Sequence, residues 1–161
     1  MENKEEFDKF YKYISIESGS ETLVVLNGHL LLEDLMMDCC LSKVANDSAL
    51  RDAKLGFLQL LHLCRANLSH TPQSWVVGGL KKMNSLRNKL AHNLEPDDYK
   101  KARDEFVALI RSHSGNKSKY AENIQKHKEI ALAITDLYIA LLVYLKFKPL
   151  NVLQLLARGA K

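Results

Sequence analysis

The sequence predicts an all-α bundle of five or six helices, folded as one domain over residues 1–161. Only seven glycines and three prolines occur in the chain, which leaves few turns for a β-sandwich or a barrel. Apolar residues recur at intervals of three or four nearly throughout, which is the period of an amphipathic helix. Hydrophobic residues make up 47% and charged residues 26% of the chain, a globular balance that excludes a disordered chain.

Capping residues and prolines divide this pattern into helices. Ser20 and Ser48 are good N-caps, because a hydroxyl oxygen accepts a hydrogen bond from the first turn. Pro96 fits the first turn of a helix, and Pro149 ends the last one. The expected helices therefore cover about 4–16, 21–43, 49–67, 75–93, 96–114 and 118–147, with an N-terminal segment over 1–19 and a short C-terminal tail over 148–161.

Charge is distributed unevenly along the chain. The net charge is +4, but residues 1–50 carry four lysines and ten acidic residues, so this third is negative and the remainder is strongly basic. A basic body is compatible with a polyanionic partner such as RNA.

The cysteines and the termini indicate a cytoplasmic protein. Cys39, Cys40 and Cys64 lie in apolar runs without metal-ligand spacing, so they are expected to be buried thiols in a reducing compartment. The polar N-terminus has no signal-peptide core, and the apolar stretch 130–145 is too short for a membrane span. No membrane partner is therefore expected.

Motifs for metals and cofactors are absent from the sequence. The six histidines are scattered, and Gly78-Gly79 lacks the context of a phosphate-binding loop. His29 and Glu33 are four residues apart, so they share a helix face, where a polar contact is expected rather than a metal pair. The expectation is no metal and no cofactor.

One motif stands out in the sequence. Residues 86–93 read LRNKLAHN, in which Arg87 is followed by Asn88 and, five positions on, by His92. This string resembles the R-x4-6-H motif of the HEPN superfamily. The order of NGHLLLEDLM with Glu33, then DAKLGFLQLLHLC, the motif and KEIALAITDLYIALL is similar to the mannitol operon repressor-like branch. The resemblance covers about residues 21–145.

The resemblance implies a small helical homodimer and, as in many HEPN proteins, a metal-independent ribonuclease. The implied function is an endoribonuclease of the toxin–antitoxin or defence type, with RNA as substrate and an antitoxin or regulatory protein as partner. The alternative is a non-catalytic transcriptional regulator or adaptor similar to the mannitol operon repressor.

The motif residues suit RNA cleavage by the neighbouring 2′-OH. Arg87 would bind phosphate, His92 would transfer the proton, and Asn88 would orient the imidazole. Arg87 and His92 lie about 140° apart on a straight helix, so convergence needs a helix end near His92 or a second copy of the chain. Alternatively, Arg87 pairs with an acid and His92 interacts with the helix C-terminus.

Basic residues on the motif helix and the next helix form a possible RNA-binding rim. Its members are Lys81, Lys82, Lys89, Lys100, Lys101 and Arg103. The alternative is a solvated face with pairs such as Lys101–Glu105. Trp75 and Tyr99 are either base-stacking or packing residues, and Asp136 is expected to point to solvent.

Overall fold

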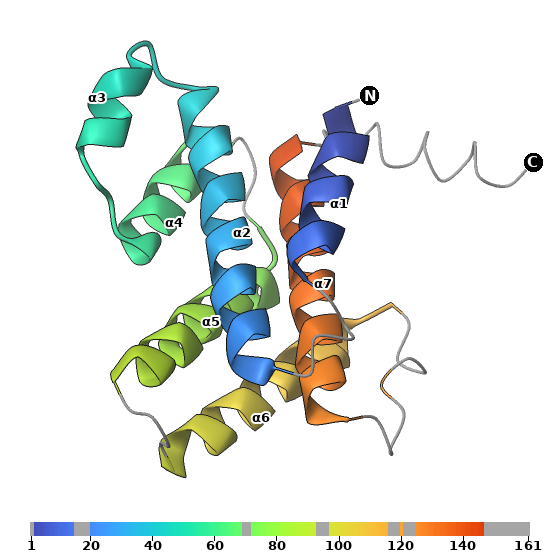
Figure 1. Cartoon of the computed structure of the whole chain (residues 1–161). Coiled ribbons are helices and arrows are strands. Elements are labelled where there is room, and N and C mark those ends of the chain that lie inside the picture. The colour runs from blue at the N-terminus through green and yellow to red at the C-terminus, as the bar shows by residue number, and fades with distance from the viewer. Residues whose placement is uncertain are drawn as a thin grey trace, which may run out of the picture.

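The computed structural model describes residues 2–14, 20–68, 72–92, 97–115, 120 and 125–146, without the side chains of residues 2–7, 92, 97, 126 and 146. These residues form a helical bundle without strands, which confirms the all-α prediction (Figure 1). The described ranges hold one helix more than the five or six expected. They are α1 (Glu2–Tyr13), α2 (Glu21–Leu41), α3 (Asp47–Asp52), α4 (Phe57–Ala66), α5 (Ser74–His92), α6 (Asp97–His113) and α7 (Lys126–Lys146).

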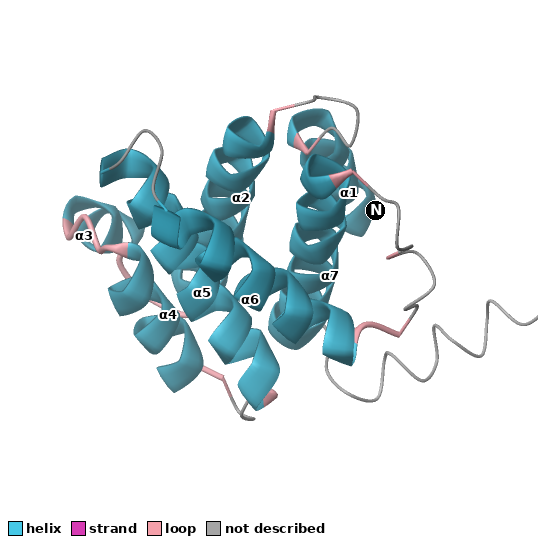
Figure 2. Ribbon diagram, turned by 90° about the horizontal axis from the view of Figure 1, so that it is seen from below, coloured by secondary structure: helices cyan, strands magenta, loops and turns pink. Residues whose placement is uncertain are grey.

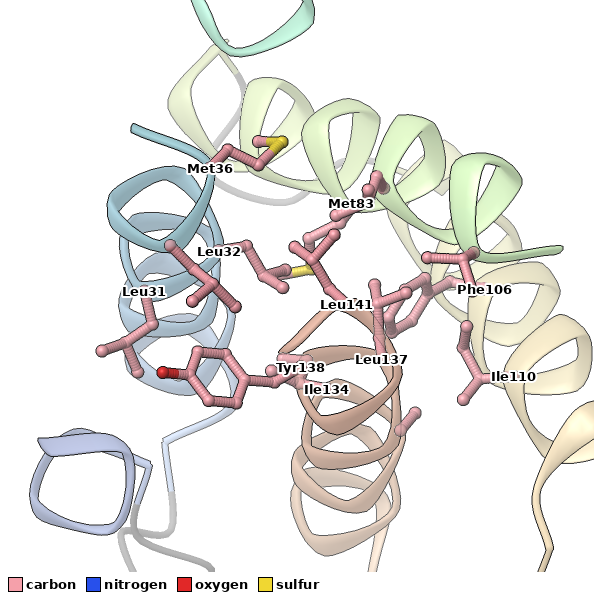
Figure 3. Packing of buried hydrophobic residues seen from close by; sticks show 14 of the residues in the cluster. Leu31, Leu32, Met36, Met83, Phe106, Ile110, Ile134, Leu137, Tyr138 and Leu141 are labelled. Carbon is pink, nitrogen blue, oxygen red and sulfur yellow. The ribbon is translucent and has the colours of Figure 1, made fainter. Parts of the chain in front are cut away.

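Helix α2 is central because it packs against α1, α4, α5 and α7. The Ser20 hydroxyl accepts a 3.3 Å hydrogen bond from the Leu23 N–H, which confirms the predicted N-cap. Figure 2 shows α5 between α4 and α6, and Figure 3 shows side chains of α2, α5, α6 and α7 meeting in one core. Ten of the 21 residues of α2 are buried, as its central position requires.

Gly28 allows α2, α5 and α7 to approach one another closely. A Cβ at Gly28 would lie 2.8 Å from Cγ2 of Ile134 on α7 and 3.2 Å from Cε of Met83 on α5. Real Cβ atoms essentially never approach another atom as closely as the first of these distances. The absence of a side chain at Gly28 therefore lets α2, α5 and α7 meet one residue before His29.

The prediction of one continuous third helix is wrong, because two helices, α3 and α4, occupy this part of the chain. Lys54 adopts a left-handed φ of 46°, and α4 begins after Gly56, whose N–H donates to Gln59 Oε1 at 2.9 Å. The N-cap of α3 is Asn46 rather than Ser48, since Asn46 Oδ1 accepts from the Ala49 N–H at 3.1 Å. The break turns the start of α4 toward α2.

The last helix begins at Lys126 rather than near residue 118. The polar start of the predicted helix lacks an apolar stripe to bury, and Tyr120 packs into the core with 1% of its surface exposed. The Tyr120 hydroxyl donates to Asp136 Oδ2 at 2.7 Å, so Asp136 does not simply point to solvent as expected. Pro96 and the tail over 148–161 lie outside the described residues.

Two further expectations can be compared with the described residues. All three cysteines are free and buried, as predicted. None of the described helices combines the length and the apolarity that a membrane crossing needs.

Candidate functional site

A surface pocket of about 420 Å³ lies where α2, the start of α4 and the C-terminal half of α5 meet. Helices α2 and α5 contribute polar side chains to it, the start of α4 contributes both apolar and polar ones, and Gly56 before α4 completes the wall. The lining residues are His29 and Glu33 from α2, Gly56, Phe57, Leu58 and Gln59 at the start of α4, and Asn84, Arg87 and Asn88 from α5.

Two of the three predicted catalytic residues line this pocket. Arg87 and Asn88 are exposed, while their neighbour Leu86 is fully buried and fixes the rotation of α5 about its axis. Arg87 Nη1 donates to Asn88 Oδ1 at 3.3 Å. His92 is the last residue of α5, but its side chain lies outside the described residues. Its convergence with Arg87 and its orientation by Asn88 therefore stay predictions.

The histidine that the structure places in the pocket is His29. Only 6% of its surface is exposed, and its ring lies 4.3 Å from the Phe57 ring, with 30° between their planes. Its Nε2 is 3.2 Å from Asn84 Oδ1. Burial lowers the pKa of His29 from 6.5, and the Arg87 charge lowers it further, against the hydrogen bond with Asn84 that raises it. His29 is therefore mainly neutral at pH 7.

Glu33 supplies the carboxylate of the pocket. Its Oε2 lies 3.7 Å from His29 Nδ1, which is the polar contact predicted from their spacing. Its side chain is 30% exposed, and its pKa is raised by burial and by the Asp34 charge, while the Arg87 charge acts in the opposite direction. The pocket thus holds a partly buried acidic group at Glu33 and an exposed cationic group at Arg87.

The sequence contained a signal for part of this site that the motif comparison missed. Asn84, Arg87 and Asn88 are spaced three and four residues apart, so they form a polar stripe on one face of α5. The partner of Asn84 is His29, which is 55 positions away in the sequence. No local pattern could have joined these two residues.

The predicted basic rim is only partly present as an exposed group. Lys81, Lys100 and Lys101 are exposed. Lys82 Nζ lies 2.8 Å from Glu105 Oε2, and Lys89 Nζ lies 3.8 Å from Asp98 Oδ2. The hydrogen bond and the charge of Lys82 lower the pKa of Glu105. The motif helix and the next one are therefore linked by surface ion pairs.

Arg103 differs from the prediction, because it is not part of an exposed rim. Only 4% of its surface is exposed, since it lies on the apolar stripe of α6. Its Nη1 lies 3.5 Å from Glu21 Oε2, and its Nε donates to Asp104 Oδ1 at 3.0 Å. The guanidinium of Arg103 joins α6 to the start of α2 and is not presented to a phosphate.

The two candidate stacking aromatics make contacts within the chain. The Tyr99 hydroxyl donates to Glu21 Oε1 at 2.6 Å. The Trp75 ring stacks on His113, with centroids 5.3 Å apart, and its Nε1 donates to Gln73 Oε1. Both therefore act as packing residues in this structure.

Within the ranges that the structure describes, no group of three or more His, Cys, Asp or Glu side chains is placed to hold a metal ion. Comparisons of the chain with models of protein families, with curated proteins and with solved structures find no match.

Proposed function

We propose that this chain is a metal-independent endoribonuclease of the HEPN type that acts as a homodimer in the cytoplasm. The observation that supports it is the position of Arg87 and Asn88. They lie side by side and exposed at a polar pocket, on the helix whose last residue is His92. A structural arginine would instead be expected to be buried against acids, as Arg103 is.

The reaction is an attack of the 2′-OH of RNA on the adjacent phosphorus. His92 takes the 2′-OH proton, and the 2′-oxygen forms a bond to phosphorus while the bond between phosphorus and the 5′-oxygen of the next nucleotide breaks. The leaving 5′-oxygen takes a proton from water, and the imidazolium of His92 returns its proton to water. Arg87 binds the phosphate oxygens, on which charge grows in the transition state. Asn88 is one turn before His92 and bonds to Arg87, so it can hold the relative orientation of the two groups. The products are a 2′,3′-cyclic phosphate and a 5′-hydroxyl.

A second copy of the chain is part of the proposal. Leu23 and Leu30 lie seven residues apart on α2 and are 53% and 57% exposed, and Ile139 on α7 is 37% exposed. Large exposed apolar side chains are typical of an interface. A two-fold dimer with α5 near its axis would bring two copies of Arg87 and His92 into one cleft. Sedimentation at micromolar concentration tests it, and a monomer would contradict it.

Cleavage of a mixed-sequence RNA by the purified dimer tests the catalytic proposal. His92→Ala is expected to lower the rate about 10²-fold to 10⁴-fold, because it removes the proton-transferring group. Arg87→Ala should weaken both RNA binding and turnover, and EDTA should have no effect. The products should end in a 2′,3′-cyclic phosphate.

The matched control is His62→Ala, which removes an exposed histidine of α4 that does not line the pocket. It should cleave like the wild type. Equal cleavage by wild type and His92→Ala would reveal a contaminating nuclease. A well-folded dimer that cleaves no RNA would refute the enzyme and favour the HEPN-like regulator or adaptor.

A further inference from the structure

The charged and titratable residues of the pocket differ in their exposure. Glu33 is half-buried, His29 is buried and mainly neutral, and Arg87 is exposed. A phosphate beside the Glu33 carboxylate would be repelled, whereas a phosphate beside Arg87 would be attracted. The two charges therefore suit a ligand whose anionic group lies at Arg87 and whose uncharged part lies at Glu33.

The walls of the pocket suit a flat heteroaromatic ring. Phe57 is 5% exposed beside the His29 ring, and Leu58 is 41% exposed at the start of α4. Three amide side chains, from Gln59, Asn84 and Asn88, lie among these apolar groups. A volume of about 420 Å³ is within the range of small-molecule sites, in which apolar walls hold the ligand and a few polar groups orient it. A nucleobase has the apolar faces and the polar edge that this lining requires.

The Glu33 carboxylate can distinguish the bases by the number of hydrogen-bond donors that each base offers to it. A carboxylate only accepts hydrogen bonds, and it has about four lone-pair sites. Its 3.7 Å contact with His29 is longer than a hydrogen bond, so the carboxylate keeps capacity to accept. Guanine alone presents two donor atoms side by side on one edge, the N1–H and the 2-amino group. Adenine, cytosine and uracil each present one donor atom there.

We propose that this pocket binds the base of a guanine nucleotide, with Glu33 accepting from N1–H and the 2-amino group and Arg87 binding the phosphate. Asn84 orients the His29 ring, and Nδ1 of that ring lies 3.7 Å from the Glu33 carboxylate. The inference rests on the proposed ribonuclease for the origin of the guanine in an RNA strand, while binding itself requires no cleavage. It would make the enzyme selective for cuts next to guanine.

Calorimetric titration of the wild-type protein with the four nucleoside monophosphates, inosine monophosphate and inorganic phosphate tests the proposal. Guanosine monophosphate should bind at least about 10-fold more tightly than the other three nucleotides, because good bidentate contacts discriminate bases by such factors. Inosine monophosphate, which keeps N1–H but lacks the 2-amino group, should bind more weakly than guanosine monophosphate. Equal affinity for all four nucleotides, or binding of phosphate alone, would overturn the inference.

Two substitutions separate base recognition from phosphate binding. Glu33→Gln should lower guanosine monophosphate affinity about 10-fold to 100-fold and change the other affinities little, because an amide donor then faces the N1–H. Arg87→Ala should weaken all four nucleotides by a similar factor. The matched control is Asp52→Asn, which removes an exposed carboxylate of α3 outside the pocket lining and should not affect binding. A uniform loss in Glu33→Gln would contradict the role of Glu33. Wild-type selectivity decides the question should that variant fail to fold.

The variant His92→Ala keeps the two proposals distinguishable. It should still select guanosine monophosphate, since the proposed contacts to the base and the phosphate come from Glu33 and Arg87, which this variant keeps. Guanine selectivity without any RNA cleavage would leave the binding site standing and refute the ribonuclease. Cleavage that depends on His92 but is indifferent to guanine would refute the binding site alone.

Discussion

At its first turn and again in its middle, α2 brings a basic side chain close to an acidic one. The two places differ in how completely the charges are paired. At the first turn, Arg103 reaches two carboxylates, of Glu21 and Asp104, and Glu21 also accepts from the Tyr99 hydroxyl. Burial alone would lower the pKa of Arg103, but the hydrogen bond with Asp104 and the charge of Glu21 raise it. Every charge in this cluster has a close partner.

The middle of α2 lacks this close pairing. His29 Nδ1 and Glu33 Oε2 are 3.7 Å apart. Burial lowers the pKa of His29 and raises the pKa of Glu33, so it favours the neutral form of each. Arg87 influences both but bonds to the neutral Asn88. The difference teaches that the completeness of charge pairing separates a structural cluster from a candidate binding site.

The largest expected effect is on stability at the first turn of α2. Arg103→Met should lower the free energy of unfolding by about 3 kcal/mol, because removing one partner of a buried ion pair leaves the other uncompensated. Urea denaturation measures it. The same substitution at the exposed Arg87 should change stability by no more than about 0.5 kcal/mol. Similar losses in the two variants would break the comparison.

A smaller effect is expected from one hydroxyl in the same cluster. Tyr99→Phe should lower the free energy of unfolding by about 1.5 kcal/mol, since the hydroxyl donates to a carboxylate. Tyr13→Phe is the control, because Tyr13 is 46% exposed. A difference of less than about 0.5 kcal/mol between the two variants in urea denaturation would show that Arg103 alone holds Glu21.

The smallest effect sharpens the account of the pocket through its pH dependence. The pKa of His29 is lowered from 6.5 in the folded chain, so the unfolded chain binds more protons as the pH falls past that value. Stability from His29 is therefore complete above pH 6.5 and is lost as the pH falls through its folded pKa. Glu33 acts in the opposite direction at lower pH, because its folded pKa is raised above 4.5.

The free energy of unfolding is measured between about pH 7.5 and 5.5, where the effect of His29 is expected, and the contribution of His29 is isolated by comparing two variants. His29→Gln, which can still bond to Asn84, should flatten the loss of stability in this window. His62→Gln, which removes an exposed histidine of α4, should retain it. An identical pH profile for His29→Gln and the wild type would contradict the neutral, buried state of His29.

Local signals were sufficient for much of the fold. The start of α2 follows from Ser20, because an N-cap acts within one turn. The break between α3 and α4 was missed because apolar periodicity continues across it. Gly56 and Gln59 are spaced as a cap, and this was the available signal. The end of α3 depends on Lys54 in a left-handed conformation, which no propensity for lysine predicts.

The candidate site was less accessible to sequence reasoning. Arg87 and Asn88 were found because they are adjacent and belong to a motif. The burial of Arg103 was missed, although it lies three, four and seven residues before Phe106, Val107 and Ile110, on one apolar stripe. Its partner Glu21 is 82 positions away, and only the folded chain brings them together. Long-range charge pairing has no local sequence pattern.

Gly28 has a consequence for how substitutions elsewhere reach the pocket. It holds α2 against Ile134 and Met83, and the next residue along the same helix is His29. A larger residue on this inner side would turn or shift α2 as a rigid rod, because the packed core does not yield easily. The imidazole and the Glu33 carboxylate would then move together while every contact between them was kept. Substitutions on the core side of α2 would thus change how His29 and Glu33 are aligned with the pocket residues of α5, without altering any residue that lines the pocket.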